Sequence, residues 1–122
     1  MSNSLNILGS KLEACCYNPL TGFYRDGYCH SNTHDIGRHL VCAQLTDSFL
    51  QYSLSQGNDL ISAHPNIGFP GLKAGDAWCL CINRWLEAHN AGCAPMIYPN
   101  ATHILTLKYV NLEILMRYAV KE

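Results

Sequence analysis

The chain has little charge and no long apolar run. Charged residues make up 14% of the 122 residues, against roughly 25% in an average domain. Hydrophobic residues make up 48%, which excludes a disordered chain because disorder needs the opposite balance. No apolar run approaches the roughly 18 to 20 residues that span a bilayer, and residues 1–10 lack the cationic and apolar parts of a signal peptide. We therefore expect a cytoplasmic protein that does not enter a membrane.

An excess of basic residues and the common site motifs are also missing. Eight Lys and Arg against nine Asp and Glu give a formal charge of −1, so no cationic field attracts nucleic acid. The chain contains no G-x-G-x-x-G, no P-loop and no G-x-S-x-G, which leaves no recognisable phosphate cradle or serine nucleophile. We expect no nucleic-acid partner, and the length predicts a single domain over residues 1–122.

Local signals predict an α+β domain. Thr46, Asp76 and Asn111 stand where helix N-caps are expected, and they predict helices over about 47–56, 78–90 and 112–119. Alternating patterns predict short strands at 6–8, 39–45, 95–98 and 105–109, and residues 22–28 fit one arm of a hairpin. Residues 57–76 show no periodicity, and loops of that length are often functional. The expected architecture is about three helices packed on four or five short strands.

The seven cysteines are the most unusual feature of the composition. Their odd number and the missing export signal argue against a disulfide framework, so we expect most of the thiols to be reduced. Cys79 and Cys81 follow Asp76 at the start of the predicted Trp78 helix. An extended entry to that helix would turn both thiols to one side, and the N–H groups of a helix start favour thiolate. The alternative is that both cysteines are small buried hydrophobic residues.

Cys29, His39 and Cys42 supply a second set of nitrogen and sulfur ligands of the kind that zinc prefers. If residues 39–42 are extended, His39 and Cys42 face opposite sides, so only one of them can join a given site. The spacings of zinc fingers and zinc ribbons are absent, and both classes are excluded. A dispersed site for zinc or another thiophilic metal, made by Cys29, His39, Cys79 and Cys81, stays open. The alternative is a thiol-rich core with one hydrogen-bonded histidine.

Several segments together resemble a family of small bacterial proteins with plant relatives, known as domain of unknown function 2237. The resemblance covers about residues 8–119 and rests on the segments PLTGFYRDG (19–27), HLVCA (39–43), GNDL (57–60), GFPGLKAGDAWCLC (68–81), RW (84–85) and ATH (101–103). It implies that the family pattern includes Cys15, Cys29, Cys42, Cys79, Cys81, His39 and His103. Ala63 and Ala74 depart from the pattern, which favours proline at both positions. The resemblance implies no activity.

These observations lead to one main functional hypothesis and two alternatives. The main hypothesis is a thiol-bearing domain that binds a metal or a small ligand where the long loop meets the start of the Trp78 helix. Its candidate site residues are Cys79, Cys81, Cys29, Cys42, His39 and Asp76. The alternatives are an enzyme with a reactive cysteine, and a structural or protein-interaction module with a cysteine-rich core. The sequence does not identify a substrate or a protein partner.

Overall fold

A computed structural model describes residues 4–22, 25–30 and 38–120. Within these residues the chain forms three strands and three α-helices. In chain order the elements are β1 (Val41–Gln44), α1 (Asp47–Ser55), β2 (Ala77–Leu80), α2 (Ile82–Asn90), β3 (Met96–Ile97) and α3 (Leu112–Arg117). The α+β class is therefore confirmed, although the described residues contain three strands rather than four or five. That residues 1–122 form one domain stays a prediction.

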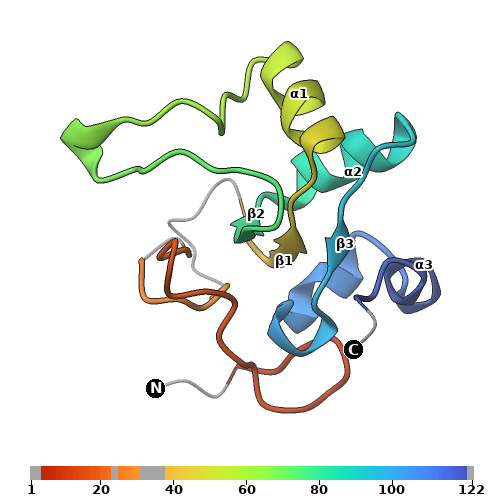
Figure 1. The fold of residues 1–122 in the computed structure, drawn as a ribbon. Helices are drawn as coiled ribbons and strands as arrows, with labels where there is room; N and C mark the ends of the chain where they lie inside the picture. The colour runs from red at the N-terminus through yellow and green to blue at the C-terminus, as the bar shows by residue number, and fades with distance from the viewer. Residues whose placement is uncertain (1–3, 23–24, 31–37, 121–122) are drawn as a thin grey trace.

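The strands form one antiparallel sheet in the order β2-β1-β3. Figure 1 shows α1 and α2 together at one end of this small sheet, with α3 beside β3. Side chains alternate across β1 and β2, so the two faces of the sheet have different surroundings. One face belongs to the main hydrophobic core, whose buried members include Val41, Ala43, Phe49, Trp78, Leu80, Trp85, Ile97 and Leu115. The other face carries Cys42 and Cys79, which pack with Cys29 and Ala101.

Two of the helix starts agree with the sequence prediction. The Thr46 hydroxyl accepts a hydrogen bond from the Phe49 N–H at 3.1 Å, and Asn111 Oδ1 accepts one from the Ile114 N–H at 3.0 Å. Both are side-chain caps, which satisfy amide groups that a helix start leaves without a partner. The starts of α1 and α3 are therefore confirmed at the residues that the sequence indicates.

The prediction that a helix begins at Trp78 is wrong for the first turn. Residues 77–80 form strand β2 instead, and the helix begins only at Ile82 with Cys81 as its N-cap residue. Register pairs Cys79 with Cys42 and Trp78 with Ala43, so pairing with a strand far away in the chain overrides the helical spacing of the local sequence. The helix body up to Asn90 is confirmed.

Three other local predictions fail or lie outside the described residues. The expected strand at 105–109 is a 3₁₀ helix (Ile104–Lys108). The expected strand at 6–8 is reduced to one isolated bridge, between Asn6 and His103. The proposed hairpin arm at 22–28 includes residues 23–24, which lie outside the described residues, while residues 25–28 form bends.

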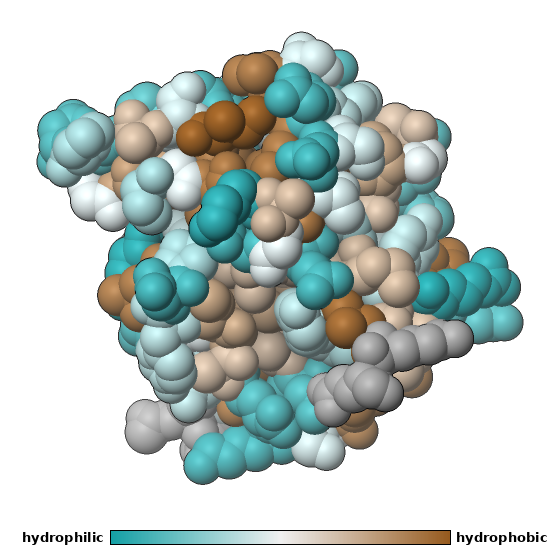
Figure 2. Space-filling view, viewed as in Figure 1, coloured by the Kyte–Doolittle hydropathy of each residue, from teal (hydrophilic) through white to brown (hydrophobic). Residues whose placement is uncertain are grey.

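The long loop between α1 and β2 projects from the rest of the molecule. It leaves α1, turns in a short 3₁₀ helix (Pro65–Ile67) and returns to β2. Figure 2 shows apolar side chains gathered where the loop leaves α1, and polar side chains over its tip. Gly71 sits at a φ of 80°, and a Cβ there would meet the Ile61 carbonyl oxygen at 2.5 Å. The two arms of the loop therefore approach each other at a position that only glycine fits.

The N-terminal part of the chain, residues 4–22 and 25–30, contains none of the named strands or helices. It runs beside the sheet and the 3₁₀ helix (Pro99–Ala101). Buried Asn6 helps to hold it, because its side-chain amide donates to the Asn100 carbonyl at 3.0 Å. Across the described residues, none of the helices is both long enough and apolar enough to pass through a lipid bilayer.

Candidate functional site

Four of the seven cysteines form two disulfides, which corrects the expectation that most thiols are reduced. Cys15 bonds to Cys42, and Cys29 bonds to Cys79. The remaining cysteines, Cys16, Cys81 and Cys93, are free and partly exposed. Counting cysteines cannot reveal pairing because pairing depends on which segments the fold brings together. Here each bond joins the N-terminal segment to a strand of the sheet.

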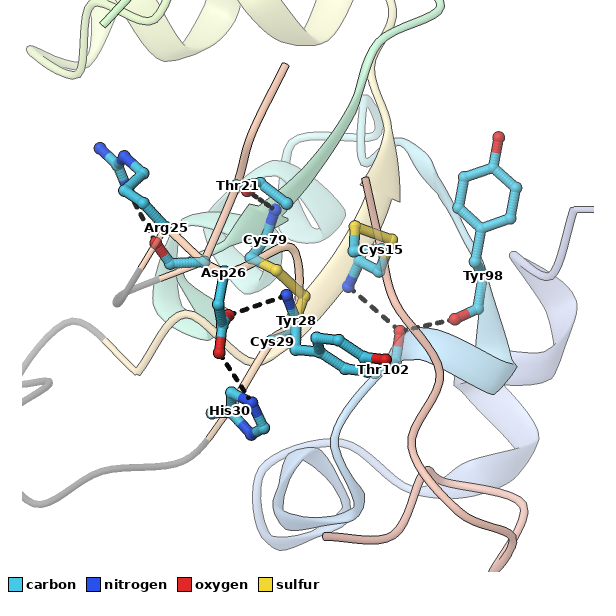
Figure 3. The surroundings of a disulfide bond; sticks show 12 residues. Cys15, Thr21, Arg25, Asp26, Tyr28, Cys29, His30, Cys79, Tyr98 and Thr102 are labelled. Atoms are coloured by element: carbon cyan, nitrogen blue, oxygen red, sulfur yellow. Dashed lines mark hydrogen bonds and ion pairs between the residues drawn. A yellow bond between two sulfur atoms is a disulfide. The ribbon is translucent and has the colours of Figure 1, made fainter. Parts of the chain in front are cut away.

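The two disulfides lie side by side. Cys42 on β1 and Cys79 on β2 are directly opposite each other in the register, so their side chains lie on the same face of the sheet. Neither bonds to the other: each bonds to a cysteine of the N-terminal segment that covers this face. Figure 3 shows the Cys29–Cys79 bond with Cys15 of the second disulfide next to it. The sulfur atoms of Cys15, Cys29 and Cys79 all lie within 4.8 Å of one another.

Two buried threonines hold the backbone around the disulfides. The Cys79 N–H donates to Thr21 Oγ1 at 2.7 Å, and the Cys42 N–H donates to Thr102 Oγ1 at 3.2 Å. Both threonine side chains are fully buried. These bonds connect segments that are 58 and 60 residues apart in the chain, and they do not depend on the sulfur atoms.

Two polar contacts hold residues 25–30 near Cys29. Asp26 Oδ1 accepts a hydrogen bond from the Tyr28 N–H at 3.1 Å, which closes a local turn of the kind that aspartate favours. Its other carboxylate oxygen lies 3.0 Å from Nε2 of His30. Figure 3 shows Asp26 between Tyr28 and His30, while Arg25 points away from them. The Arg25 side chain therefore points to the opposite side from the Asp26–His30 ion pair.

A cleft of about 580 Å³, called the Trp78 cleft below, opens where the long loop meets β2. It is lined by Gly22, Arg25, His39, Asp59, Leu60, His64, Ile67, Phe69, Trp78 and Cys79. Phe69 and Trp78 are buried and meet edge to face, with ring centroids 5.5 Å apart. A smaller cleft of about 230 Å³ shares His39, Leu60, Trp78 and Cys79 with it and adds Cys81 and Arg84. The two clefts thus adjoin along the outer side of β2.

Arg25 is held over the indole of Trp78. Its guanidinium carbon lies 5.2 Å from the ring centroid, a cation–π distance, and one of its N–H groups donates to the Gly22 carbonyl at 2.8 Å. Its backbone has a φ of 56°, which is uncommon for a residue with a side chain. Because the loop is bonded to β2 through Cys29 and Cys79, the disulfide helps to fix Arg25 at the cleft.

Asp59 and His64 bring further polar groups to the same cleft. Asp59 Oδ1 accepts hydrogen bonds from the N–H groups of Ser62 and Ile61, at 3.1 and 2.9 Å. Hydrogen bonding to Ser62 is the main cause that lowers the pKa of Asp59, with Ile61 and the charge of His64 acting in the same direction. The carboxylate is therefore ionised at neutral pH. His64 stacks on Phe69, with ring centroids 6.1 Å apart.

The residues predicted from sequence separate into three places. Cys79, Cys81 and His39 line the Trp78 cleft or the adjoining one. Cys29 and Cys42 lie in the buried disulfides. Asp76 does not cap a helix, because its Oδ2 accepts a hydrogen bond from the Lys73 N–H at 3.0 Å and closes the turn before β2.

The structure also regroups the candidate metal ligands. Among the described residues, the cluster of side chains close enough to share one ion is Cys15, Cys29 and Cys79. Two of the four sequence candidates, Cys29 and Cys79, belong to it, whereas His39 and Cys81 lie outside it. Cys15 joins because it lies in the N-terminal segment that covers the sheet, a placement that no local spacing reveals.

Three charged or polar side chains of the cleft, Arg25, Asp59 and His64, were not among the sequence candidates. Arg25 and Asp59 have stronger sequence signals for turns, and both indeed lie in turns. His64 stands in the unpatterned long loop. The available signal was the loop itself, because its length suggests function and because it leads directly to Trp78.

Comparison with known proteins identifies the family but assigns no activity. No curated protein matches the chain. A family model described as "Uncharacterized protein conserved in bacteria (DUF2237)" matches residues 5–119. The match spans nearly the whole chain, including both disulfides and the Trp78 cleft. The chain therefore belongs to the DUF2237 family of uncharacterised proteins conserved in bacteria.

Proposed function

We propose that this protein binds a small, flat organic anion in the Trp78 cleft. The observation that carries the proposal is the Arg25 guanidinium held over the Trp78 ring beside a cleft of about 580 Å³. Small-molecule sites are typically concave, mostly apolar and supplied with a few converging polar groups, at volumes of roughly 300 to 1,000 Å³. The Trp78 cleft fits that description.

Arg25 supports the choice of an anion. A guanidinium carries five N–H donors in a planar fork that matches a carboxylate or phosphate. The bond to the Gly22 carbonyl uses one of these donors and fixes the side chain, so the others can meet a ligand without a large loss of side-chain entropy. His39 and His64 line the same cleft, and His64 can contribute a further donor.

The aromatic residues support the choice of a flat molecule. Trp78 and Phe69 are 6% and 7% exposed, so they form a firm surface at the base of the cleft. Arg25 lies over the ring of Trp78, so a flat ligand can meet the exposed edges of these rings in edge-to-face geometry. Ionised Asp59 lies on the same cleft, and it disfavours a second negative group while accepting a hydrogen bond from a hydroxyl or amine. The ligand class is thus an aromatic or conjugated monoanion.

Backbone geometry supports the same location. Within the described residues, two amino acids other than glycine have positive φ, Arg25 at 56° and Arg38 at 51°. Arg25 lines the cleft and Arg38 directly precedes His39, which also lines it. Uncommon backbone conformations cost free energy and gather at binding and catalytic sites. The positions of Arg25 and Arg38 therefore favour the Trp78 cleft, rather than another part of the surface, as the binding site.

A second large cleft, of about 530 Å³, is a weaker candidate for the same ligand. It lies between the N-terminal segment and the C-terminal end of the chain and includes Glu13, Tyr98 and Asn100. Glu13 Oε2 accepts a hydrogen bond from the Asn100 amide at 3.2 Å. The charged group that this cleft offers is a carboxylate, which repels anions.

A titration followed by NMR tests the proposal. We expect benzoate to shift the backbone amide signals of Asp59, Leu60 and Cys79, and benzamide, the neutral analogue, to bind at least 10-fold more weakly. Equal binding of benzoate and benzamide, or shifts confined to the other cleft, would contradict the proposal.

Substitution of Arg25 provides the matched test. Arg25→Gln keeps a polar side chain but removes the charge, and it should weaken benzoate binding at least 10-fold, equivalent to about 1.4 kcal/mol. Arg117→Gln removes an equal charge from exposed α3 and should leave binding unchanged. If both variants weaken binding equally, the effect is one of net charge and not of the cleft.

A second candidate function, an enzyme with a reactive cysteine, rests on Cys81. This free thiol lines the smaller cleft together with His39 and Arg84, and Cys–His pairs are common nucleophile arrangements. The test is hydrolysis of an activated ester such as p-nitrophenyl acetate. An enzyme would turn over repeatedly, lose the activity in Cys81→Ala and keep it in Cys93→Ala.

We retain the cytoplasm as the proposed location. A reducing compartment does not usually preserve structural disulfides, so the proposal requires that the protein functions with some or all of its four paired cysteines reduced. Trapping of thiols in intact cells, followed by mass spectrometry, measures this directly. Fully oxidised pairs in the cell would contradict a cytoplasmic location.

A further inference from the structure

We infer that the reduced protein holds one zinc ion between Cys15, Cys29, Cys42 and Cys79. The two disulfides and the metal site are then alternative states of the same four sulfur atoms. This site is separate from the anion-binding cleft, although Cys79 borders both.

The positions of the four cysteines carry the inference. Cys42 and Cys79 are fixed next to each other by the register of β1 and β2, while Cys15 and Cys29 approach from the N-terminal segment. In tetrahedral zinc sites each Zn–S bond is about 2.3 Å, which places the sulfurs about 3.8 Å apart. The sulfurs of Cys15, Cys29 and Cys79 already lie within 4.8 Å of one another. Cys42, bonded to Cys15, is the fourth ligand within reach.

Burial makes this arrangement suitable for a closed structural site. Cys29 and Cys42 are 0% exposed and Cys79 is 1% exposed, and they pack against Ala101. Structural zinc sites exclude water and take all four ligands from the protein. After reduction, the three buried thiols can lose protons only if a cation balances their charge, because isolated buried anions are strongly disfavoured; Cys15, which is partly exposed, closes the site on its outer side.

The scaffold can survive the loss of both disulfides. The Cys79 N–H is held by Thr21 and the Cys42 N–H by Thr102 through bonds that do not involve sulfur. The pairing of β1 with β2 likewise rests on backbone hydrogen bonds. Cys42 and Cys79 therefore keep their relative position after reduction. The hydrogen bond from Cys79 to Thr21 keeps Thr21 beside β2 and so holds the N-terminal segment, which carries Cys29, near Cys79.

The conversion balances as a thiol–disulfide exchange. Each disulfide accepts two electrons and two protons from a small or protein dithiol, which becomes a disulfide itself. Two such steps give four thiols, and zinc binding releases their protons to solvent as four Zn–S bonds form. In the reverse direction, two molecules of a disulfide oxidant each take two electrons from a pair of thiolates and two protons from solvent, which converts them to dithiols, and the ion leaves as the two protein disulfides form. The protein thus couples metal release to oxidation.

Metal titration of the intact protein tests the inference. The protein is reduced with a phosphine, freed of reductant without oxygen, and titrated with Co²⁺ and then with Zn²⁺. We expect one equivalent of Co²⁺ to produce thiolate-to-cobalt charge-transfer bands and tetrahedral d–d bands, both of which zinc abolishes. The oxidised protein should give neither. Absence of these bands in reduced protein that is folded by circular dichroism would overturn the inference.

The identity of the ligands needs two further measurements. X-ray absorption of the zinc form should show four sulfur neighbours, and any nitrogen or oxygen neighbour would overturn the assignment. Cys15→Ser and Cys42→Ser should lose the one-equivalent binding, whereas the matched variants Cys16→Ser and Cys81→Ser should keep it. Loss of binding in Cys81→Ser with retention in Cys15→Ser would place the metal elsewhere. If a variant does not fold, the X-ray absorption spectrum of the zinc form of the unmodified protein decides whether four sulfur atoms bind the metal.

Discussion

The buried hydroxyl of Thr21 accepts a hydrogen bond from the backbone N–H of Cys79 at 2.7 Å across 58 residues of sequence. This contact ties the N-terminal segment to the sheet next to the Cys29–Cys79 disulfide. Thr21 is 0% exposed, so neither partner can exchange the bond for water. A buried N–H without an acceptor costs about 1 to 3 kcal/mol.

The first prediction follows from this contact. Thr21→Val keeps the shape of the side chain but removes the acceptor, and it should lower the free energy of unfolding by about 1 to 3 kcal/mol. Thr21→Ser keeps the acceptor and should lose less. Urea unfolding measures both. A Val variant as stable as the Ser variant would show that the Cys79 N–H finds another partner.

The sequence predicts those parts of the fold that local chemistry determines. Thr46 and Asn111 cap their helices with their own side chains, so the signal and its structural result lie within one helical turn. Trp85 is buried on the apolar face of α2, at 0% exposed, and this too follows from the spacing of residues within one helix. These predictions need no knowledge of distant segments.

The failures concern features that distant segments determine. Trp78, Ile82 and Trp85 have helical spacing, but residues 77–80 pair with β1, which lies more than 30 residues earlier. The two cysteines of each disulfide are likewise far apart in the chain, by 27 residues in one bond and by 50 in the other. Chain order brings the long loop to Trp78 at the cleft, whereas Arg25 reaches the cleft through the fold of the N-terminal segment.

The second prediction concerns acid sensitivity through His103. Burial is the main cause that lowers the pKa of His103, and the nearby charge of His30 acts in the same direction. The neutral ring also serves the fold, because its Nδ1 accepts the Leu105 N–H at 3.0 Å. A histidine with a lowered folded-state pKa stabilises the fold above the unfolded value of about 6.5, and that contribution is lost as the pH falls below it.

We therefore expect the stability to fall between about pH 6.5 and the lower pKa of His103 in the folded protein. His103→Asn supplies an amide oxygen in the position of Nδ1 but does not titrate, so it should reduce this pH dependence. Urea midpoints from pH 5 to 8 measure the effect. The same slope in the variant and in the natural protein would assign the acid sensitivity to another group.

The third prediction concerns the core at Trp85. Its indole N–H donates to the Pro95 carbonyl at 3.1 Å, and its ring stacks on His89 and meets Tyr118 edge to face. Trp85→Ala should cost about 3 to 5 kcal/mol of unfolding free energy. The control is Asn83→Ala, an exposed position on the same helix, which should change stability by less than about 0.5 kcal/mol. A loss below about 1 kcal/mol at Trp85 would contradict its place in the core.

The fourth prediction separates the disulfides from the main core. In the chain-entropy treatment, bonds that close segments of 27 and 50 residues stabilise by about 3 to 4 kcal/mol each, less when they overlap. None of the paired cysteines belongs to the main hydrophobic core. Reduction in the presence of EDTA should therefore increase hydrogen exchange in residues 13–22 and 25–30 and leave α1 and α2 protected. Loss of protection in α2 would show that the core depends on the bonds.

The last prediction concerns the order in which the cysteines react. Without reductant, iodoacetamide should label Cys16, Cys81 and Cys93 and leave Cys29 and Cys79 unlabelled, because a disulfide offers no thiolate. Burial raises the pKa of Cys93, so its thiolate is scarce at neutral pH and its labelling should be slower than that of N-acetylcysteine. The rate at Cys93 should rise about 10-fold per pH unit while the pH stays below its pKa, in proportion to the thiolate. Mass spectrometry with site assignment follows each residue, and Cys93→Ser should remove only the slow phase. Labelling of Cys79 before any reductant is added would mean that the Cys29–Cys79 bond is open in solution.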